Sequence, residues 1–341
     1  MPDNAVRIAV IGAGPSGFYA AAALTLQKDI EVRVDLFDRL PAPYGLVRYG
    51  VAPDHPKIKT VTNLYDKTAQ DPRVRFFGNV SFGRDLNLDN MRPIYDMVLF
   101  CSGAQSDRAM GVPGENLPGS ISATEFVAWY NGHPDYANLN PDLSCTGVAV
   151  VGVGNVAMDV ARILAKTVDE LRGTDIAEHA LEALSRSKVK NIYVLGRRGP
   201  AQAKFTNTEI KEFGHLADAD PVVLPAELEL DPHSRQTVEQ DKIARQNVDV
   251  LREFAARGAG SKSRKVHFRF LVSPVEVVGR NGRAAALRIE RNKLESSQDG
   301  YLEAKGSGQF ETLETGLVLR SVGYMGVPLP GVPFDKRKGT I

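Results

Sequence analysis

The beginning of the chain alternates short apolar runs with a longer Ala-rich segment. Val6–Ile11 is apolar at most positions and has the length of a buried parallel strand. A glycine-rich turn follows, then the Ala-rich segment Pro15–Gln27, which has the composition of a helix. A second apolar run, Val32–Phe37, comes next and ends at Asp38. This order of strand, helix and strand predicts a β–α–β unit.

The same pattern returns in the middle of the chain. Gly147–Val151 predicts a strand, Val156–Ala165 a helix and Ile192–Leu195 the next strand, with another glycine-rich turn between the first two. Two such units in one chain indicate an α/β fold with two Rossmann-like dinucleotide-binding domains.

Weaker patterns predict the remaining elements. Further helices are expected at Asn63–Gln70, Thr124–Tyr130, Thr208–Leu216 and Thr237–Ala256. Further strands are expected at Val74–Phe77, Met97–Cys101, Val266–Val278, Ala284–Arg291 and Leu313–Leu319. Two segments rich in Gly, Ser and charge are expected to be loops, Gly258–Lys265 and Glu295–Gly308. Leu40–Lys59 is rich in Pro, Gly and Tyr, and we expect a long, ordered and functional loop there.

Composition narrows the class of protein. The chain has 341 residues, of which 43% are hydrophobic and 24% charged, and this length suits two domains. The formal net charge is only +1, so a charged partner would have to bind a local patch. No apolar run is long enough to span a membrane, and the N-terminus lacks a signal-peptide pattern. Cys101 and Cys145 lie far apart, which favours a reducing compartment. We expect a cytoplasmic protein without a metal site.

The first glycine-rich turn has the spacing of a dinucleotide-binding fingerprint. Gly12 permits a tight turn, Gly14 lets the backbone approach a pyrophosphate, and Gly17 lets helix and strand pack closely. The helix N-terminus then offers free N–H groups to the phosphates. Asp38 ends the next strand, where an acid binds a ribose hydroxyl. This site suits FAD or NAD.

The second turn has the variant spacing with alanine in the third position, Gly152, Gly154 and Ala157. Its next strand ends in Arg197 and Arg198 rather than in an acid. Arginines at this place pair with the 2′-phosphate of NADP; the alternative is that they only end a solvated strand. Two sites with opposite ribose chemistry imply two dinucleotides, and one chain that binds both most simply moves hydride between nicotinamide and flavin.

These residues also carry a family resemblance. The sequence resembles the adrenodoxin-reductase-like class of ferredoxin–NADP⁺ reductases, of the bacterial type. The matching stretches are IGAGPSGFYAA, PYGLVRYGVAPDHPKIK, CSGAQSDR, VVGVGNVAMDVARIL, GRRGPAQAKFT and LRSVGYMGVPLPG, which together span nearly the whole chain. The resemblance implies hydride transfer from NADPH to FAD, followed by single-electron transfer to a ferredoxin-type iron–sulfur protein.

The resemblance also implies a domain plan and a set of contacts. Residues 1–104 would belong to the FAD domain, 105–324 would form an inserted NADP domain, and 325–341 would start a return to the FAD domain. The implied FAD contacts are Ala13, Asp38, Leu46 and Val80. The implied NADP contacts are Arg108, Asn155, Val156, Ala157, Met158, Arg197, Arg198 and Glu209. The family's Gly-Trp segment and GPTG-type turn are missing, so the chain resembles a C-terminally shortened member that lacks the rest of the return.

Three side chains are candidates for the active site. His55, in the long loop, would lie near the flavin edge, or it is a structural histidine bonded to backbone. Glu209 would contact the nicotinamide amide or ribose, or it is a first-turn glutamate that favours the helix dipole. Asp159 belongs to the active site or to a helix surface. Ser102 and Gly103 follow a strand end and are expected to touch FAD.

A basic set on one predicted helix is a candidate docking surface. Lys242, Arg245 and Arg252 fall within about 80° of one another on a helix of 3.6 residues per turn. Such a set is usually a solvated face, but an acidic ferredoxin-type partner would use it for steering. No nucleic-acid-binding motif accompanies it.

Other functions remain open from the sequence. A disulfide reductase would need a redox CxxC pair, which is missing. A glutamate-synthase-type NADPH oxidoreductase subunit would usually add N-terminal cysteine clusters, which are also missing. A catalytically silent or fragmentary NADP-binding module is the alternative from another class.

Overall fold

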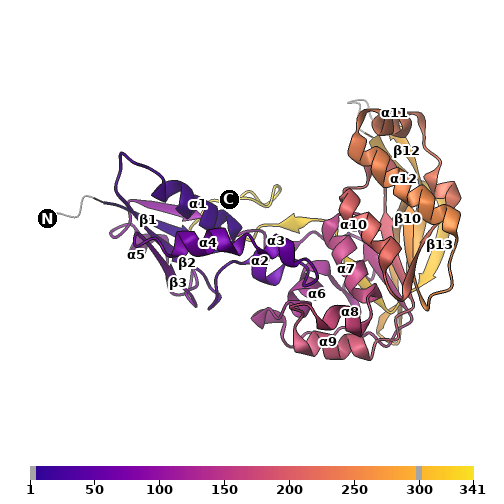
Figure 1. The fold of residues 1–341 in the computed structure, drawn as a ribbon, viewed down its shortest axis with the longest axis horizontal. Helices are drawn as coiled ribbons and strands as arrows, with labels where there is room; N and C mark the ends of the chain where they lie inside the picture. Colours follow the sequence, from indigo (N-terminus) through magenta and orange to yellow (C-terminus); the bar gives the residue numbers. More distant parts are fainter. Residues whose placement is uncertain (1–4, 297–301) are drawn as a thin grey trace. The chain divides into compact units, whose positions relative to one another are not determined.

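The computed structural model describes residues 5–296 and 302–341, and they form two compact units. The first unit combines the chain up to Arg108 with Gly323–Ile341, and the second is Ala109–Val322. The chain therefore leaves the first unit, builds the second and returns (Figure 1). Among the described helices, none is both long enough and apolar enough to cross a membrane.

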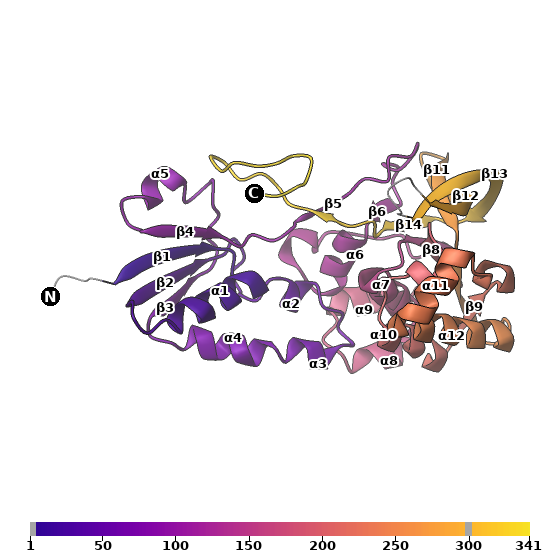
Figure 2. The ribbon, with the colours of Figure 1, turned by 90° about the horizontal axis from the view of Figure 1, so that it is seen from above.

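The first unit is built on a four-stranded parallel sheet in the order β3-β2-β1-β4. The strands are β1 (Val6–Ile11), β2 (Val32–Phe37), β3 (Val74–Phe77) and β4 (Met97–Phe100). Its helices are α1 (Pro15–Thr25), α2 (Leu46–Tyr49), α3 (Pro56–Lys59), α4 (Thr62–Ala69) and α5 (Leu88–Met91). A short antiparallel pair, β5 (Ser106–Asp107) and β15 (Tyr324–Met325), joins the two segments of this unit. Figure 2 shows α1 and α4 on one side of the sheet and α5 on the other.

The side chains of β1 alternate between the two faces of the sheet, and each face has its own layer of helices. Ile8 and Val10 belong to the core cluster formed with α1 and α4, which includes Phe18 and Tyr65. Ala9 and Ile11 point to the opposite face, in a smaller cluster that includes Met91 of α5. A strand buried on both faces must be apolar at successive positions, and this produces the apolar run of the sequence.

The long segment Leu40–Lys59 is ordered, as its composition predicts. Tyr44 packs against Phe18 and Tyr65, with ring centroids 5.2 and 5.7 Å away, and its N–H donates to the carbonyl of Ala13 at 2.8 Å. Two single helical turns, α2 and α3, lie within it. The aromatic contacts hold this segment against the glycine-rich turn at Ala13.

The second unit is built on a six-stranded parallel sheet in the order β6-β14-β7-β8-β10-β9. The strands are β6 (Ser120–Ser122), β7 (Gly147–Val151), β8 (Asn191–Gly196), β9 (Ala219–Val223), β10 (Arg264–Phe270) and β14 (Leu317–Arg320). Its α-helices are α6 (Ala123–Tyr130), α7 (Asn155–Ala165), α8 (Val168–Arg172), α9 (Glu178–Ser185), α10 (Asn207–Glu212), α11 (Pro232–Gln240) and α12 (Lys242–Arg257). Its 3₁₀ turns are η1 (Pro134–Tyr136), η2 (Pro200–Gln202), η3 (Phe213–His215) and η4 (Pro225–Leu228).

The two faces of this sheet are covered differently. Val148 and Val150 of β7 face the helices, in a large core cluster that includes residues of α6, α7, α9, α10 and α12. Ala149 and Val151 face an antiparallel sheet of three strands, β11 (Val272–Arg280), β12 (Arg283–Ser296) and β13 (Leu302–Glu314). The second unit is therefore a three-layer structure of helices, parallel sheet and antiparallel sheet.

Three elements differ from the sequence prediction because one residue interrupts each. The expected helix Thr237–Ala256 is two helices, since the Asp241 carboxylate accepts the N–H groups of Ile243 and Ala244 and starts α12. The expected strand Val266–Val278 breaks at Leu271, which has a φ of +55°, so β10 and β11 enter different sheets. The expected strand Leu313–Leu319 likewise divides between β13 and β14 around Thr315.

The loop expected at Glu295–Gly308 is wrong for its described part. β12 runs to Ser296 and β13 starts at Leu302, and the two strands pair in register from Asn292 to Ser296. An ion pair of 2.8 Å between Lys305 and Glu295 crosses this ribbon. Polar residues form strands here because the ribbon extends beyond the core, where cross-strand pairs replace apolar burial.

Candidate functional site

The first glycine-rich turn lies where β1 ends beside β4. Gly12 has a φ of +108°, and a Cβ there would lie 2.2 Å from the carbonyl oxygen of Cys101. A Cβ at Gly17 would lie 2.0 Å from the carbonyl oxygen of Gly12. Both positions therefore exclude any side chain. The chain continues from β1 to β2 on one side, whereas β4 lies on the other side, which makes this the switch point where ligands bind in such sheets.

Gly14 has a different environment from its two neighbours in the fingerprint. It is the N-cap of α1 and provides no side-chain acceptor for the first N–H groups of the helix. A Cβ there would meet only the Cα of Gly45, at 3.8 Å. The backbone at Gly14 is thus approachable, and the helix N-terminus behind it attracts an anion.

Asp38 holds the end of β2 against the glycine-rich turn. One carboxylate oxygen accepts the N–H of Ala13 at 2.8 Å, and the other accepts the N–H of Leu40 at 2.9 Å. The N–H of Val80 donates to the carbonyl of Asp38 at 2.9 Å. A carboxylate has about four lone-pair positions, so Asp38 can accept further donors from a bound ribose.

The other residues expected to contact FAD lie around the same edge of the sheet. Ser102 and Gly103 lie just beyond β4, separated from it by Cys101, and Gly103 has a φ of +69° with nothing within 4 Å of a Cβ position. Leu46, at the start of α2, is 53% exposed, although it is a large apolar residue. Arg108, an expected NADP contact rather than an FAD contact, is the last residue of the N-terminal segment of the first unit, and its N–H donates to the carbonyl of Gly323 at 2.9 Å.

The second glycine-rich turn repeats this construction between β7 and α7. Gly152 has a φ of +141°, and a Cβ there would lie 2.2 Å from the carbonyl oxygen of Ser321, beyond the end of β14. Gly154 is the N-cap of α7, and nothing lies within 4 Å of its Cβ position. Ala157 is completely buried under the turn. The second unit therefore also has a closed turn with an approachable helix N-terminus.

Arg197 and Arg198 follow β8 directly, next to this turn in the sheet. Their backbone carbonyls are held, since that of Arg197 accepts the side-chain amide of Asn292 at 2.8 Å and that of Arg198 accepts the N–H of Leu271 at 3.1 Å. Arg197 is exposed and Arg198 half-buried. Neither guanidinium forms an ion pair with a residue in the described part of the chain, so both remain available for an anion.

Sequence reasoning missed the residue that organises the predicted carboxylates. Arg162 of α7 is completely buried, and its guanidinium binds Asp159 at 2.6 Å, Glu209 at 2.7 Å and Glu212 at 3.2 Å. Asp159 precedes Arg162 by three positions on α7, whereas Glu209 and Glu212 come from α10. The i, i+3 spacing of each helix pair was the available signal. Asp159 and Glu209, predicted separately, are thus brought together.

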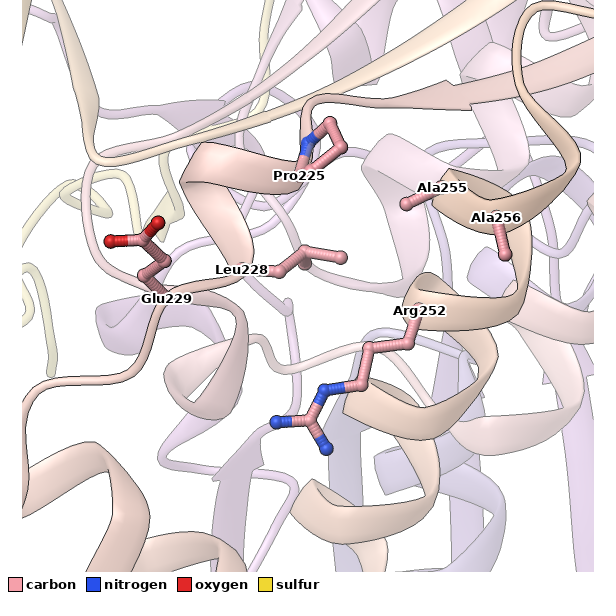
Figure 3. Close-up of a pocket in the computed structure, with 6 residues that line it drawn as sticks. All are labelled: Pro225, Leu228, Glu229, Arg252, Ala255 and Ala256. Atoms are coloured by element: carbon pink, nitrogen blue, oxygen red, sulfur yellow. The ribbon is translucent and has the colours of Figure 1, made fainter.

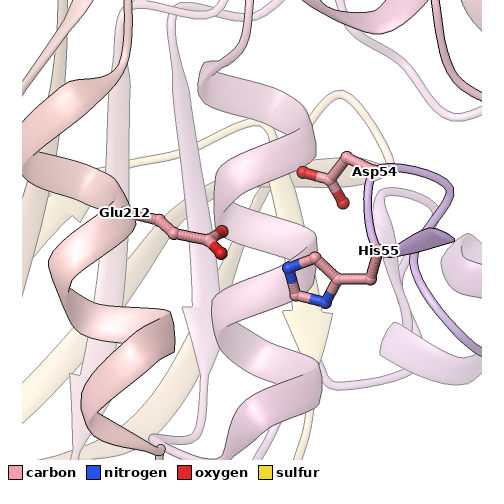
Figure 4. A group of neighbouring side chains, drawn as sticks. All are labelled: Asp54, His55 and Glu212. Atoms are coloured by element: carbon pink, nitrogen blue, oxygen red, sulfur yellow. The ribbon is translucent and has the colours of Figure 1, made fainter. Parts of the chain in front are cut away.

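His55 and its neighbour Asp54 belong to the first unit. Both lie on the loop before α3, and His55 is the N-cap of that short helix (Figure 4). The N–H of His55 donates to the carbonyl of Ala52 at 3.0 Å, so its backbone position is fixed. Figure 4 also labels Glu212, which is the last residue of α10 in the second unit.

A shallow hollow of 370 Å³ lies elsewhere on the second unit, between η4 and α12 (Figure 3). Its lining residues are Pro225, Leu228, Glu229, Arg252, Ala255 and Ala256. Of the residues singled out in the sequence, it includes only Arg252. It contains none of the residues expected to bind a dinucleotide.

The basic set on α12 is exposed but partly neutralised. Lys242 and Arg245 are exposed and form no ion pair with a described residue. Arg252 lies 3.5 Å from Asp249, three positions earlier on the same helix. The positive charge of this face is therefore concentrated at the beginning of the helix.

Comparison with known proteins adds independent findings. Residues 6–194 match the family described as pyridine nucleotide-disulphide oxidoreductase. The NADPH-ferredoxin reductase FprA of Mycobacterium tuberculosis is 47% identical over 338 residues, which are 98% of this chain and 74% of that protein. The human mitochondrial NADPH:adrenodoxin oxidoreductase is 41% identical over 351 residues, 99% of this chain and 70% of that protein. The structure of M. tuberculosis FprA in complex with NADPH superimposes with a TM-score of 0.94, covering 99% of this chain and 75% of that one.

The two glycines of the second turn offer a matched pair of substitutions. We expect Gly152→Ala to lower the free energy of unfolding by about 3 kcal/mol or more, because the Cβ would overlap the carbonyl of Ser321 at a strained positive φ. We expect Gly154→Ala to change it by less than about 1 kcal/mol, because that Cβ meets no neighbour. Urea unfolding measures both values. Equal destabilisation of the two variants would contradict the open space at Gly154.

Proposed function

Because the chain belongs to the pyridine nucleotide-disulphide oxidoreductase family and, within it, to the adrenodoxin-reductase-like ferredoxin–NADP⁺ reductases, we propose that it is an NADPH-dependent flavoprotein reductase. It would take hydride from NADPH onto FAD and deliver single electrons to a ferredoxin-type iron–sulfur protein. The observation that carries this proposal is the presence of two closed glycine turns, one beside Asp38 and the other beside Arg197 and Arg198.

The first unit has the features that FAD requires. The approachable backbone at Gly14 and the uncapped N-terminus of α1 suit a pyrophosphate, and Asp38 suits the ribose hydroxyls. The residues that would complete the site are Gly12, Ala13, Gly17, Leu46, Val80, Ser102 and Gly103. FAD, when bound, accepts two electrons as a hydride and releases them singly. We assign residues 1–104 to this domain and 325–341 to the start of its return.

The second unit has the features that NADP(H) requires. The N-terminus of α7, with Gly152, Gly154 and the run Asn155–Met158, would hold the pyrophosphate. Arg197 and Arg198 would pair with the 2′-phosphate through charge-assisted hydrogen bonds. Arg108 and Glu209 would add contacts. We assign residues 105–324 to this domain.

His55, Asp159 and Glu209 are the proposed active-site side chains. Hydride transfer between a bound nicotinamide and a bound flavin would need no acid or base from the protein, so none of these groups would have to transfer a proton. Their proposed role is to orient the nicotinamide and ribose through hydrogen bonds, and for this reason substitutions should slow the reaction rather than abolish it.

A cytoplasmic location is also proposed. Cys101 and Cys145 are both free thiols, which agrees with a reducing compartment.

The first experiment is flavin reduction. We expect the FAD-loaded protein to lose its flavin absorbance when it is mixed anaerobically with NADPH, and to reduce a ferredoxin afterwards. A yellow protein that neither nicotinamide nucleotide reduces would contradict the proposal. A colourless protein that binds NADPH would instead favour the silent NADP-binding module. Electron transfer to the catalytic subunit of a glutamate synthase supplied with glutamine and 2-oxoglutarate, but not to ferredoxin, would favour the glutamate-synthase-type subunit.

Coenzyme preference tests the arginine pair. We expect Arg197→Ala with Arg198→Ala to raise the KM for NADPH by at least one hundredfold and to change the KM for NADH by less than threefold. Each lost charge-assisted hydrogen bond to the 2′-phosphate costs about 1.5–3 kcal/mol, and NADH has no such phosphate. Steady-state kinetics with both coenzymes measures the preference. An equal loss with NADPH and NADH would place the 2′-phosphate elsewhere.

Docking of the iron–sulfur partner is proposed at Lys242, Arg245 and Arg252. The support is their exposure on α12 and the absence of an ion pair for the first two within the described chain. An acidic partner would be steered to this face, with a rate that falls as salt is added.

Charge reversal tests this surface. We expect Lys242→Glu, Arg245→Glu and Arg252→Glu together to lower the rate of ferredoxin reduction at low ionic strength by about tenfold or more, without changing flavin reduction by NADPH. The matched control reverses three other exposed charges of this unit, Arg172, Arg186 and Lys188. Stopped-flow rates at several salt concentrations provide the measurement. Equal effects of the two triple variants would mean that α12 is not the docking surface.

A further inference from the structure

The ion cluster between α7 and α10 has an unusual charge balance. One guanidinium, that of Arg162, meets three carboxylates, which leaves these four side chains with a formal charge of −2 when all are ionised. Each nitrogen position of the guanidinium has its own partner: Nη1 contacts Glu209, Nη2 contacts Asp159, and Nε contacts Glu212. Arg162 has no exposed surface.

Such a cluster is poorly explained as a device for stability alone. Taking a charge out of water costs several kcal/mol, and apolar residues of similar size are often as stabilising as a buried ion pair. Carboxylates that share one cation also repel one another. The helices are already joined one turn earlier, where the side chain of Asn155 accepts the N–H of Thr206 at 3.0 Å. The cluster is therefore not needed to join α7 to α10, and what it fixes is the orientation of its own carboxylates.

The position of the cluster indicates what it fixes. α7 begins at Gly154, the approachable turn proposed to hold the pyrophosphate, and Asp159 lies about one turn into the same helix. Thr206 caps α10, and Glu209 lies in its first turn. The carboxylates of Asp159 and Glu209 are thus held close to the phosphate end of α7 by a residue that lies one turn further along that helix.

Charge decides which part of NADP(H) these carboxylates can serve. Carboxylates repel the 2′-phosphate and the pyrophosphate, and the 2′-phosphate already has Arg197 and Arg198 as partners of the right sign. The nicotinamide half has what a carboxylate binds: carboxamide N–H groups, ribose hydroxyls and, in NADP⁺, a positively charged ring. Arg162 uses one oxygen each of Asp159 and Glu209, and a carboxylate can accept more than one donor.

We propose that Arg162 is a positioning residue for the nicotinamide half of NADP(H): it fixes the carboxylates of Asp159 and Glu209 in orientation. The inference rests on the proposed function and adds a residue to it. Arg162 does not touch the dinucleotide and acts only through the two carboxylates. Lysine cannot replace it, because the donors of an ammonium all sit on one nitrogen, whereas the guanidinium spreads its donors over three nitrogens that each meet a separate carboxylate.

The test compares two buried arginines of the same unit. Arg269 of β10 is also buried and binds two carboxylates, Glu227 at 2.9 Å and Glu311 at 2.7 Å, but neither partner lies on α7 or α10. Arg162→Lys and Arg269→Lys each keep the charge and remove the guanidinium. Calorimetry on the FAD-loaded proteins gives the Kd of NADP⁺ and the Kd of 2′,5′-ADP, which lacks the nicotinamide half. Rapid mixing with NADPH gives the rate of flavin reduction.

For Arg162→Lys we expect a Kd of 2′,5′-ADP within twofold of the unaltered protein. The Kd of NADP⁺ should rise at least fivefold, and flavin reduction should slow at least tenfold at saturating NADPH. For Arg269→Lys we expect a lower melting temperature, with both Kd values and the rate within twofold. If Arg162→Lys only lowers the melting temperature, or weakens both ligands equally, Arg162 is a structural residue and the proposal is wrong.

A second variant covers the case in which Arg162→Lys does not fold. Arg162→Gln combined with Glu212→Gln removes one cation and one anion together, keeps both Asp159 and Glu209, and leaves hydrogen-bonding amides in place of the ion pair. It should show the same selective loss of NADP⁺ affinity relative to 2′,5′-ADP, and an unchanged ratio would overturn the proposal. If the unaltered protein binds NADP⁺ but NADPH does not reduce its flavin, the proposed function fails, whereas the ratio of the two Kd values still decides the role of Arg162.

Discussion

Both units depend on the approach of one glycine to the backbone of a neighbouring strand. Gly12 lies against the carbonyl of Cys101, and Gly152 lies against the carbonyl of Ser321, each so close that a Cβ would be about 2.2 Å away. This contact closes the turn between strand and helix and directs the helix N-terminus to the edge of the sheet. The next N-cap glycine, Gly14 or Gly154, is left with open space beside it. The approachable helix N-terminus of each unit is therefore a consequence of backbone packing.

The two units share the closed glycine turn, but the side chains that follow the next strand have opposite charges. Asp38 is tied to its turn by the N–H groups of Ala13 and Leu40, so the acid is part of the structure that it would use to hold a ribose. Arg197 and Arg198 are anchored only by their carbonyls, to Asn292 and Leu271, and their guanidiniums are left without an ion pair in the described chain. The carboxylate of Asp38 is thus fixed by the backbone around it, whereas the guanidiniums of Arg197 and Arg198 are not held by an ion pair within the described residues.

The pattern of apolar residues and glycines along the chain predicted the strands, helices and turns that depend on neighbouring residues. The two β–α–β units, both glycine turns and the ordered segment Leu40–Lys59 agree with the structure, because apolar runs and glycine spacing report burial and backbone approach directly. Two of the failures came from single residues that interrupt an otherwise continuous pattern. Asp241 starts a new helix, and Leu271 turns the chain from one sheet into another by donating to the carbonyl of Arg198. The ribbon of β12 and β13 is stabilised by cross-strand pairing, which the polar sequence of this segment does not predict.

Arg162 was missed for a related physical reason. An arginine on an amphipathic helix is normally placed on the solvated face, and only the packing of α10 onto α7 shows that this one is buried. Its partners Glu209 and Glu212 are about 50 residues away in the sequence, so no window of local pattern contains the cluster. The buried guanidinium of Arg162 is explained by the carboxylates around it, which need a cation to hold them together. The second unit gathers carboxylates at α10 and has, after β8, two arginines without an ion pair among the described residues. Such a distribution of charge would favour one orientation of a ligand that has phosphates at one end and a cationic ring at the other.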